Sequence, residues 1–336
     1  MSKKFIKFLC MRLAFFIVAY IVAITLVFLL PRIIPGNPLA LLLTQILQQA
    51  RVSRPEEIKE VYLVLLREFG LDKPIWMQYL DFLSRAFVGD LGTSISYYPR
   101  KVIDLIAPAL PWTLAVLVPA ILTAWSIGNV MGAVAGYRRG SIFEKVTMTF
   151  SFIMTHIPYY WFAMFILFVF GVRLRIFPVG GGYSPWLTPS LTPQFVANLL
   201  WHYIPPFLSI VLVSVGSWAI GMRFIVVNEL EGDYIIFSES LGVSDKILYR
   251  YVFRNSLLPQ VTGLALAFGN VLGGQVVMET IFNYPGTGHI LFQALVSLDY
   301  IVIQGVFIIL IATLYLANFI VDFIYVLVDP RIRIGE

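Results

Sequence analysis

Few side chains in this 336-residue sequence could do acid–base or metal chemistry, and most of them border long apolar runs. His156 lies within one run beside Pro158, Glu279 lies near the end of another, and His289 follows a Tyr-Pro-Gly turn. Ionisable side chains inside a membrane are costly and often mark transport pathways. For His156, a hydrogen-bonded interior histidine beside a proline kink is favoured over a pathway role.

The stretch Thr280–Leu295 is predicted to be a short helix that dips back at the outer mouth, because only about 16 residues separate two apolar runs. Irregular backbone at this depth is tolerated only where it is buried in protein or lines water. The stretch is therefore a candidate gate or pathway wall. The candidate pathway and gate residues are His156, Glu279, Phe282, Tyr284 and His289.

Sequence motifs for catalysis are missing. The sequence has no phosphate-binding GxxxxGK[ST] pattern, no zinc-ligand spacing, and no Ser/His/Asp arrangement in a credible setting. The single cysteine, Cys10, excludes a disulfide within the chain. We predict no metal site, no catalytic residues and no cofactor bound by this chain, so that any ATP and Mg²⁺ would be held by another subunit.

The composition is that of an integral membrane protein. Hydrophobic residues make up 59% of the sequence and charged residues only 13%, whereas a soluble domain carries about 25% charge. The net charge of +5 does not indicate nucleic acid, because the basic residues cluster at the ends of apolar runs. We therefore expect a lipid bilayer, and no nucleic acid, as a partner.

Six apolar runs are long enough to cross a bilayer, which takes about 20 residues each. These runs are Leu13–Leu30, a stretch within Ala107–Tyr137, Val146–Val172, about Trp201–Met222, about Asn255–Met278, and Tyr300–Val321. An even number of spans puts both termini on one side, and the excess of Lys and Arg there makes that side cytoplasmic. The predicted fold class is an all-α integral membrane protein with six transmembrane helices.

A soluble-like segment, about Arg32–Ile106, lies between the first two spans. Ser53 and Glu56 could form a capping box at the start of a helix that ends at Gly70. A second helix is predicted over Pro74–Phe87. Its inward-facing side chains are predicted to be Ile75, Tyr79, Phe82, Leu83 and Phe87. We expect a helical extracytoplasmic insertion, which serves either as a cap or as a docking surface for a substrate-delivering protein.

Small residues recur at helical spacing in two of the runs. Gly128, Gly132 and Gly136 share one face of the second span, and Gly269 and Gly273 share one face of the fifth. Such faces allow helix backbones to approach closely. Packing within the chain is the expected use, and contact with a second membrane chain is the alternative.

The charged segment Asp233–Pro259 lies between two apolar runs and must lie outside the lipid. We predict a helix over Tyr234–Leu241, ended by Gly242 in a left-handed conformation. Ser244 can cap a second short helix, with Asp245 near its positive end. The apolar stripe of this second helix contains Ile247, Leu248, Tyr251 and Val252. The stripe could lie on lipid, pack on its own bundle, or dock into a partner.

This segment resembles the coupling loop of ABC-importer permeases, most closely the dipeptide/oligopeptide/nickel branch. The similarity rests on the Asp-Tyr pair at Asp233, on Gly242, and on RNSLLP at Arg254–Pro259. Val276–Leu295 and Asp299–Arg333 are similar to the same branch, and the PGNP and GDLGTS motifs occur in the expected order.

One stretch departs from the wider permease pattern. Ile236, Phe237 and Ser238 stand where Glu-Ala-Ala usually precedes the glycine, and Glu239 is the only carboxylate nearby.

The resemblance implies a permease subunit in the cytoplasmic (inner) membrane that forms half of an importer's translocation pathway. The implied cargo is di- or oligopeptides, with oligosaccharides or nickel as alternatives. Implied partners are ATP-binding cassette subunits, a second homologous permease in a heterodimer, and an extracytoplasmic substrate-binding protein. The residues expected to contact the ATP-binding subunit are Tyr234, Phe237, Glu239, Ser240, Leu241, Gly242, Val243, Ser244 and Asp245.

The predicted organisation has four parts. Residues 1–30 form the cytoplasmic N-terminus and first span, 31–106 the extracytoplasmic segment, 107–328 the transmembrane core with its loop at 228–255, and 329–336 a cytoplasmic tail. An ion-coupled secondary transporter is the competing hypothesis. It would require mid-bilayer carboxylates or an inverted repeat, and the helix cores contain no Asp or Glu.

Overall fold

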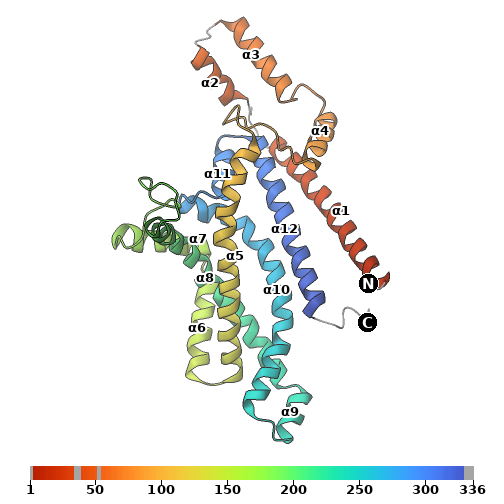
Figure 1. The fold of residues 1–336 in the computed structure, drawn as a ribbon, viewed down its shortest axis with the longest axis vertical. Coiled ribbons are helices and arrows are strands. Elements are labelled where there is room, and N and C mark those ends of the chain that lie inside the picture. The colour runs from red at the N-terminus through yellow and green to blue at the C-terminus, as the bar shows by residue number, and fades with distance from the viewer. Residues whose placement is uncertain (1–2, 34–38, 51–53, 329–336) are drawn as a thin grey trace. The chain divides into compact units, whose positions relative to one another are not determined.

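A computed structural model describes residues 3–33, 39–50 and 54–328 of the chain, and the regular structure of these residues is helical (Figure 1). One isolated bridge, between Thr93 and Lys101, interrupts this pattern. The chain divides into two compact units. The first contains Met1–Pro111 and Gly286–Leu316, and the second contains Trp112–Pro285. The predicted all-α class is confirmed.

The first unit is built from helices at both ends of the chain. It contains α1 (Lys3–Ile33), α2 (Ala40–Ala50), α3 (Pro55–Glu68), α4 (Ile75–Phe87), the start of α5 (Val102–Tyr137), α11 (Thr287–Val296) and most of α12 (Tyr300–Val328). As predicted, α3 ends just before Gly70 and α4 ends at Phe87. Ser53 of the predicted capping box lies outside the described residues.

The predicted inward face of α4 is wrong at both ends. Ile75 and Phe87 are exposed, while Tyr79, Phe82 and Leu83 are partly buried. The tertiary contacts of α4 explain the difference. Tyr79 shares a hydrogen bond with Thr25 of α1, and both Tyr79 and Phe82 pack against the ring of a phenylalanine on α1.

Asp299 organises the start of α12. Its buried carboxylate accepts hydrogen bonds from the Ser94 hydroxyl (2.6 Å), the Ser96 amide (2.8 Å) and the Val302 amide (3.2 Å). The last of these satisfies an amide in the first turn of α12 that has no partner within the helix. The GDLGTS segment, which ends at Ser94, is thereby tied to α12.

The second unit contains the longest apolar helices. Besides α5 from Trp112 onward, it has α6 (Ile142–His156), α7 (Tyr159–Ile166), a π-helical stretch η1 (Leu167–Arg173), α8 (Pro193–Leu230), α9 (Asp233–Ser240) and α10 (Asp245–Ile281). Among the described residues, α5 and α8 are long and apolar enough to cross a membrane, and α6 with α7 and η1 could make a third, bent span.

The third predicted span, Val146–Val172, is not one continuous helix. It breaks between α6 and α7 with a bend of 96°. Ile157 has extended backbone (φ −88°, ψ 118°), and Pro158 precedes the first residue of α7. A residue before proline is disfavoured from helical backbone, and proline cannot donate a helix hydrogen bond. The prediction recognised a kink beside His156 but not its size.

The glycine face of α5 packs within the chain, as expected. A Cβ atom added at Gly128 would lie 2.5 Å from Cβ of Trp218 on α8, and one at Gly136 would lie 2.8 Å from a Val226 methyl. The two backbones approach too closely for larger side chains. The surroundings of Gly269 and Gly273 lie outside what the structure describes.

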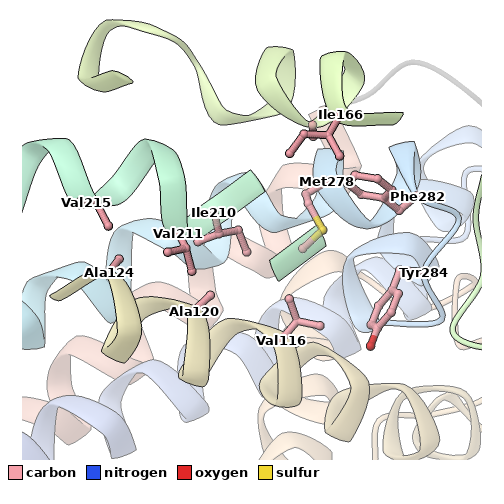
Figure 2. Packing of buried hydrophobic residues seen from close by; sticks show 11 residues of the cluster. Val116, Ala120, Ala124, Ile166, Ile210, Val211, Val215, Met278, Phe282 and Tyr284 are labelled. Atoms are coloured by element: carbon pink, nitrogen blue, oxygen red, sulfur yellow. The ribbon is translucent and has the colours of Figure 1, made fainter. Parts of the chain in front are cut away.

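The core of the second unit forms where α5, α7, α8 and the end of α10 meet (Figure 2). Small side chains of α5 face branched side chains of α8, and aromatic rings close one end of the cluster. Its members are Val116, Ala120, Ala124, Ala163, Ile166, Ile210, Val211, Val215, Met278, Phe282 and Tyr284.

We expect Gly132→Ala to destabilise the protein. The added methyl group would lie 2.3 Å from the Ala219 carbonyl oxygen and 2.9 Å from Cβ of Met222, so α5 and α8 must separate. Such overpacking costs about 1–3 kcal/mol. The measurement is the thermal unfolding midpoint of the detergent-purified protein. Gly171→Ala is the control, since its nearest atom lies at 3.5 Å; equal midpoints for both variants would contradict the packing described here.

Candidate functional site: the loop between α8 and α10

The loop contains a short helix with a sharply defined end. Helix α9 stops at Ser240, and Gly242 adopts the predicted left-handed backbone (φ 76°). The Gly242 amide donates to the Glu239 carbonyl (2.9 Å), and the Val243 amide donates to the Ser238 carbonyl (3.2 Å). This pair of bonds is a Schellman motif, which satisfies carbonyls that the helix end leaves free.

The second predicted helix of the loop is not a separate element. Helix α10 begins at Asp245 and continues for 37 residues, through Pro259, to Ile281. Ser244 occupies the N-cap position, but its side chain makes no capping hydrogen bond. The start of α10 and the following apolar run are therefore one helix, so no break in secondary structure separates them.

Half of the predicted apolar stripe packs on the chain itself. Leu248 and Val252 are buried with Ile235 of α9, whereas Ile247 and Tyr251 are exposed. The buried cluster also includes Ala133 of α5 and Met222 and Val226 of α8. The helices α5, α8, α9 and α10 thus share one small core at this end of the second unit.

Tyr234 links α9 to both neighbouring helices. Its hydroxyl group donates to Glu229 Oε2 of α8 and accepts from Asn255 Nδ2 of α10 (3.0 Å). Burial, followed by the hydrogen bond to the Glu229 carboxylate, raises the pKa of Tyr234 above its ordinary value. The phenol therefore remains protonated and able to donate at physiological pH.

The turn between α5 and α6 is attached to the same loop. The Tyr137 hydroxyl donates to the Asp245 carbonyl (3.2 Å), and its ring meets that of Tyr249 edge-on at 5.1 Å. Arg139 Nη2 donates to the Val227 carbonyl (2.8 Å) and to Glu231 Oε1 (3.0 Å). Contacts from the end of α5 and the following turn therefore reach the segments on both sides of α9.

An ion pair that the sequence reasoning missed joins α6 to α8. Glu144 Oε1 accepts from both Nε (2.9 Å) and Nη2 (2.6 Å) of Arg223, and its other oxygen accepts from the Gly140 amide (2.6 Å). A signal was present, because Ser141 and Glu144 form the Ser-x-x-Glu spacing of a capping box. The Ser141 hydroxyl does accept from the Glu144 amide (3.1 Å).

Large apolar side chains are exposed on α9 and at its C-cap, next to the polar Glu239 and Ser240. Phe237 and Leu241 are 64% and 66% exposed, and Ile236 is also exposed. Ile235 on the same short helix is fully buried, so the helix is fixed on one side and open on the other. Exposed apolar side chains gathered on one element typically mark an interaction site.

Three of the predicted gate residues come together at the end of α10. Glu279, Phe282 and Tyr284 are buried, and the Tyr284 amide donates to the Glu279 carbonyl (2.7 Å). Glu279 Oε1 accepts from the Thr113 hydroxyl (2.7 Å) and from the Gln275 amide.

The loop after η1 covers this cluster. The Gly181 amide donates to the Phe282 carbonyl (2.9 Å), and the Trp112 ring lies between those of Tyr183 and Tyr284. Contacts with α5 and with the end of α10 therefore hold this loop in place.

The two predicted histidines lie on other helices, α6 and α11. His156 is hydrogen-bonded to the Phe152 carbonyl (2.7 Å) at the end of α6, but its side chain is exposed and not interior as expected. The bend at Pro158 ends the helix at His156 and so leaves its side chain outside the core. His289 lies on α11 in the first unit, where it contacts Gln293 (2.8 Å). The described part of the chain holds no group of His, Cys, Asp or Glu suited to a metal ion.

Comparison with known families assigns residues 128–334 to one of them. These residues match the binding-protein-dependent transport system inner membrane component. The chain belongs to this family. The predicted resemblance is confirmed, and the chain is a multi-pass inner-membrane subunit without ATPase activity of its own.

Relatives of the same length support the assignment. The dipeptide transport system permease protein DppB of Escherichia coli K12 is 30% identical, over 98% of this chain and 99% of its own. The di/tripeptide permease DppB of Pseudomonas aeruginosa is 29% identical over the same shares. A putative peptide transport system permease of Brucella abortus is 33% identical, over 94% of this chain and 95% of its own.

We expect Glu144→Gln to lower the stability of this permease more than Glu231→Gln. The Glu144 and Arg223 side chains are 12% and 34% exposed, whereas Glu231 and Arg139 are 68% and 43% exposed. Weakening the less exposed pair should cost about 1–3 kcal/mol, and weakening the surface pair less than about 1 kcal/mol. Thermal unfolding of the two purified variants measures the difference. A larger loss for Glu231→Gln would refute the anchoring role of Glu144.

Proposed function

We propose that this chain is the permease subunit of an ATP-driven peptide importer and that it forms half of the translocation pathway. The observation that carries the proposal is the loop between α8 and α10, where an anchored helix presents Phe237 and Leu241 outward in a chain of the importer family. Peptides are the favoured cargo over oligosaccharides or nickel, because the relatives that match nearly the whole chain are named as dipeptide, di/tripeptide and peptide permeases.

The proposed topology has six spans: α1, α5, the bent α6–α7–η1 segment, α8, α10 and α12. Both termini and α9 face the cytoplasm, and residues 31–106 lie on the outer side. Arg138, Arg139 and Lys145 then lie on the cytoplasmic side, as the positive-inside rule requires. Residues 107–328 form the transmembrane core, with 329–336 as a cytoplasmic tail.

In the proposed mechanism, α9 seats its exposed apolar side chains in a groove of an ATP-binding cassette subunit. The contacting residues have Phe237 and Leu241 at their centre and are Tyr234, Phe237, Glu239, Ser240, Leu241, Gly242, Val243, Ser244 and Asp245. ATP-driven movement of that subunit displaces α9. Because Ile235 and Tyr234 tie α9 to α8 and α10, the displacement reaches both helices directly. The uninterrupted α10 then carries the movement toward the opposite membrane surface.

The end of α10 is the proposed outer gate. Glu279, Phe282 and Tyr284 lie at the opposite end of α10 from the loop, so movement of this helix acts on both ends. A binding protein delivers the peptide to the outer side, and a second, homologous permease completes the pathway. ATP and Mg²⁺ are held by the partner ATP-binding subunits, and this chain binds no cofactor.

We expect the double variant Phe237→Ala/Leu241→Ala to abolish ATP-coupled peptide uptake while leaving the permease folded. Both side chains are exposed, so their truncation removes little buried surface from the chain itself. The measurements are uptake of a labelled dipeptide, peptide-stimulated ATPase activity of the complex, and recovery of the ATP-binding subunit on purification.

Phe224→Ala is the matched control, since Phe224 of α8 is equally exposed but lies outside the loop. Normal uptake by the double variant would disprove the coupling role. Transport that is driven by an ion gradient and independent of ATP would replace the importer proposal with secondary transport.

A further inference from the structure

Helix α4 carries several of its apolar side chains on the outside. Trp76, Leu80 and Phe87 are 60%, 55% and 62% exposed. They follow one another at i, i+4 and i+11, so they form a stripe along a single helix face. No residue of α4 is fully buried.

The opposite face of α4 is polar and borders a cavity of the first unit, with the Asp81 side chain 43% exposed. Gln78, Asp81 and Arg85 line a cavity of about 810 Å³ together with residues of α1, α3 and α12. Gln78 accepts from Arg32 of α1 (2.8 Å), and Asp81 accepts from Lys73. The hydrogen bond from Lys73 lowers the pKa of Asp81, so its carboxylate is charged. If the outer face of α4 contacted water, the opposite arrangement would be expected, with polar side chains outside and apolar side chains inside. A helix whose outer face contacts lipid is expected to carry its apolar side chains on that face.

Contacts with α1 give the level of α4 along that helix (Figure 1). The Tyr79 hydroxyl shares a 2.6 Å hydrogen bond with Thr25, and the Phe28 ring packs against Tyr79 and Phe82 at 5.2 and 5.3 Å. Thr25 lies five residues before Leu30, which is about 7.5 Å inside the end of the apolar run at 1.5 Å per residue. Helix α4 is therefore level with the last apolar turns of α1.

We infer that α4 lies in the membrane interface at the Ile33 end of α1, with Trp76, Leu80 and Phe87 inserted among phospholipid acyl chains. The exposed apolar side chains of α1 at this level, Leu26 and Leu29, continue the lipid-facing surface. Tryptophan is typical of the boundary between headgroups and acyl chains. The inference rests on the proposal that α1 spans the bilayer, and it makes α4 an anchor in the lipid and not part of an aqueous cap.

Spin-label accessibility tests this inference in the full chain. In a Cys10→Ser background, single cysteines replace Leu80 and Phe87 on the stripe, Leu26 on α1, and the exposed Glu60 on α3. The labelled permease, purified with its co-purifying subunits, is placed in phospholipid nanodiscs. Collisions are measured with oxygen, which partitions into lipid, and with a nickel chelate, which stays in water.

We expect labels at positions 80, 87 and 26 to collide more with oxygen than with the nickel chelate, and the label at position 60 to show the reverse. Chelate-dominated collisions at 80 and 87, with position 26 in lipid, would overturn the inference and leave the span intact. Shielding of 80 and 87 from both reagents would overturn it in favour of a protein partner. Access of the nickel chelate to position 26 would reject both the proposal that α1 spans the bilayer and the inference that α4 lies in the membrane interface.

Discussion

The burial of Ile235 against α8 and α10 is the contact on which the rest of the functional loop depends. An eight-residue helix such as α9 is not stable alone in water. Full burial of one isoleucine side chain contributes roughly 1.5–3 kcal/mol, and Leu248 and Val252 extend the same cluster. Once Ile235 is fixed, the neighbouring Ile236 and Phe237 must point outward, because successive helix positions differ by about 100°. The same short helix therefore provides both the buried anchor, Ile235, and the exposed side chains Ile236 and Phe237.

The apolar surroundings place a second constraint on every charged group near the core. Glu144, Glu279 and Asp299 are buried carboxylates, and each accepts at least two hydrogen bonds. An unpaired charge in such a position would be very costly. Each carboxylate also joins segments far apart in the sequence, such as Ser94 and Asp299. The buried acids thus join one helix to another, or a loop to a helix, within each compact unit, and none of the three requires a catalytic explanation.

Much of the helical order was predictable from local chemistry. Gly242 was expected to end a helix because only a residue tolerant of positive φ completes that turn, and its φ of 76° agrees. The glycine face of α5 was expected to pack closely, and it does so against α8. These features depend on residues within a few turns of one another, so their pattern is visible in the sequence. Family membership followed from similar local motifs in the loop and near the C-terminus.

What could not be predicted depends on contacts between distant segments. Ile75 and Phe87 of α4 were expected to face inward but are exposed, because periodicity alone does not say which part of a helix another segment covers. In the predicted apolar stripe at the start of α10, Leu248 is buried and Tyr251 is exposed. Which of these side chains is buried depends on where α8 and α9 lie. Likewise, Pro158 indicated a kink, but its 96° angle is set by packing and not by the dipeptide. The ion pair of Glu144 was not predicted, because its partner, Arg223, is 79 residues away.

The most direct test of the central claim is to identify what touches α9 in the assembled transporter. A photo-crosslinking amino acid is placed at Leu241, which is 66% exposed, with Leu191 in the loop before α8, which is 98% exposed, as the control. Cells expressing the whole system are irradiated, and the adducts are identified by mass spectrometry. The account predicts an adduct between position 241 and an ATP-binding subunit, and none between position 191 and that subunit. A position 241 that crosslinks only to lipid or to an extracytoplasmic protein would contradict the account.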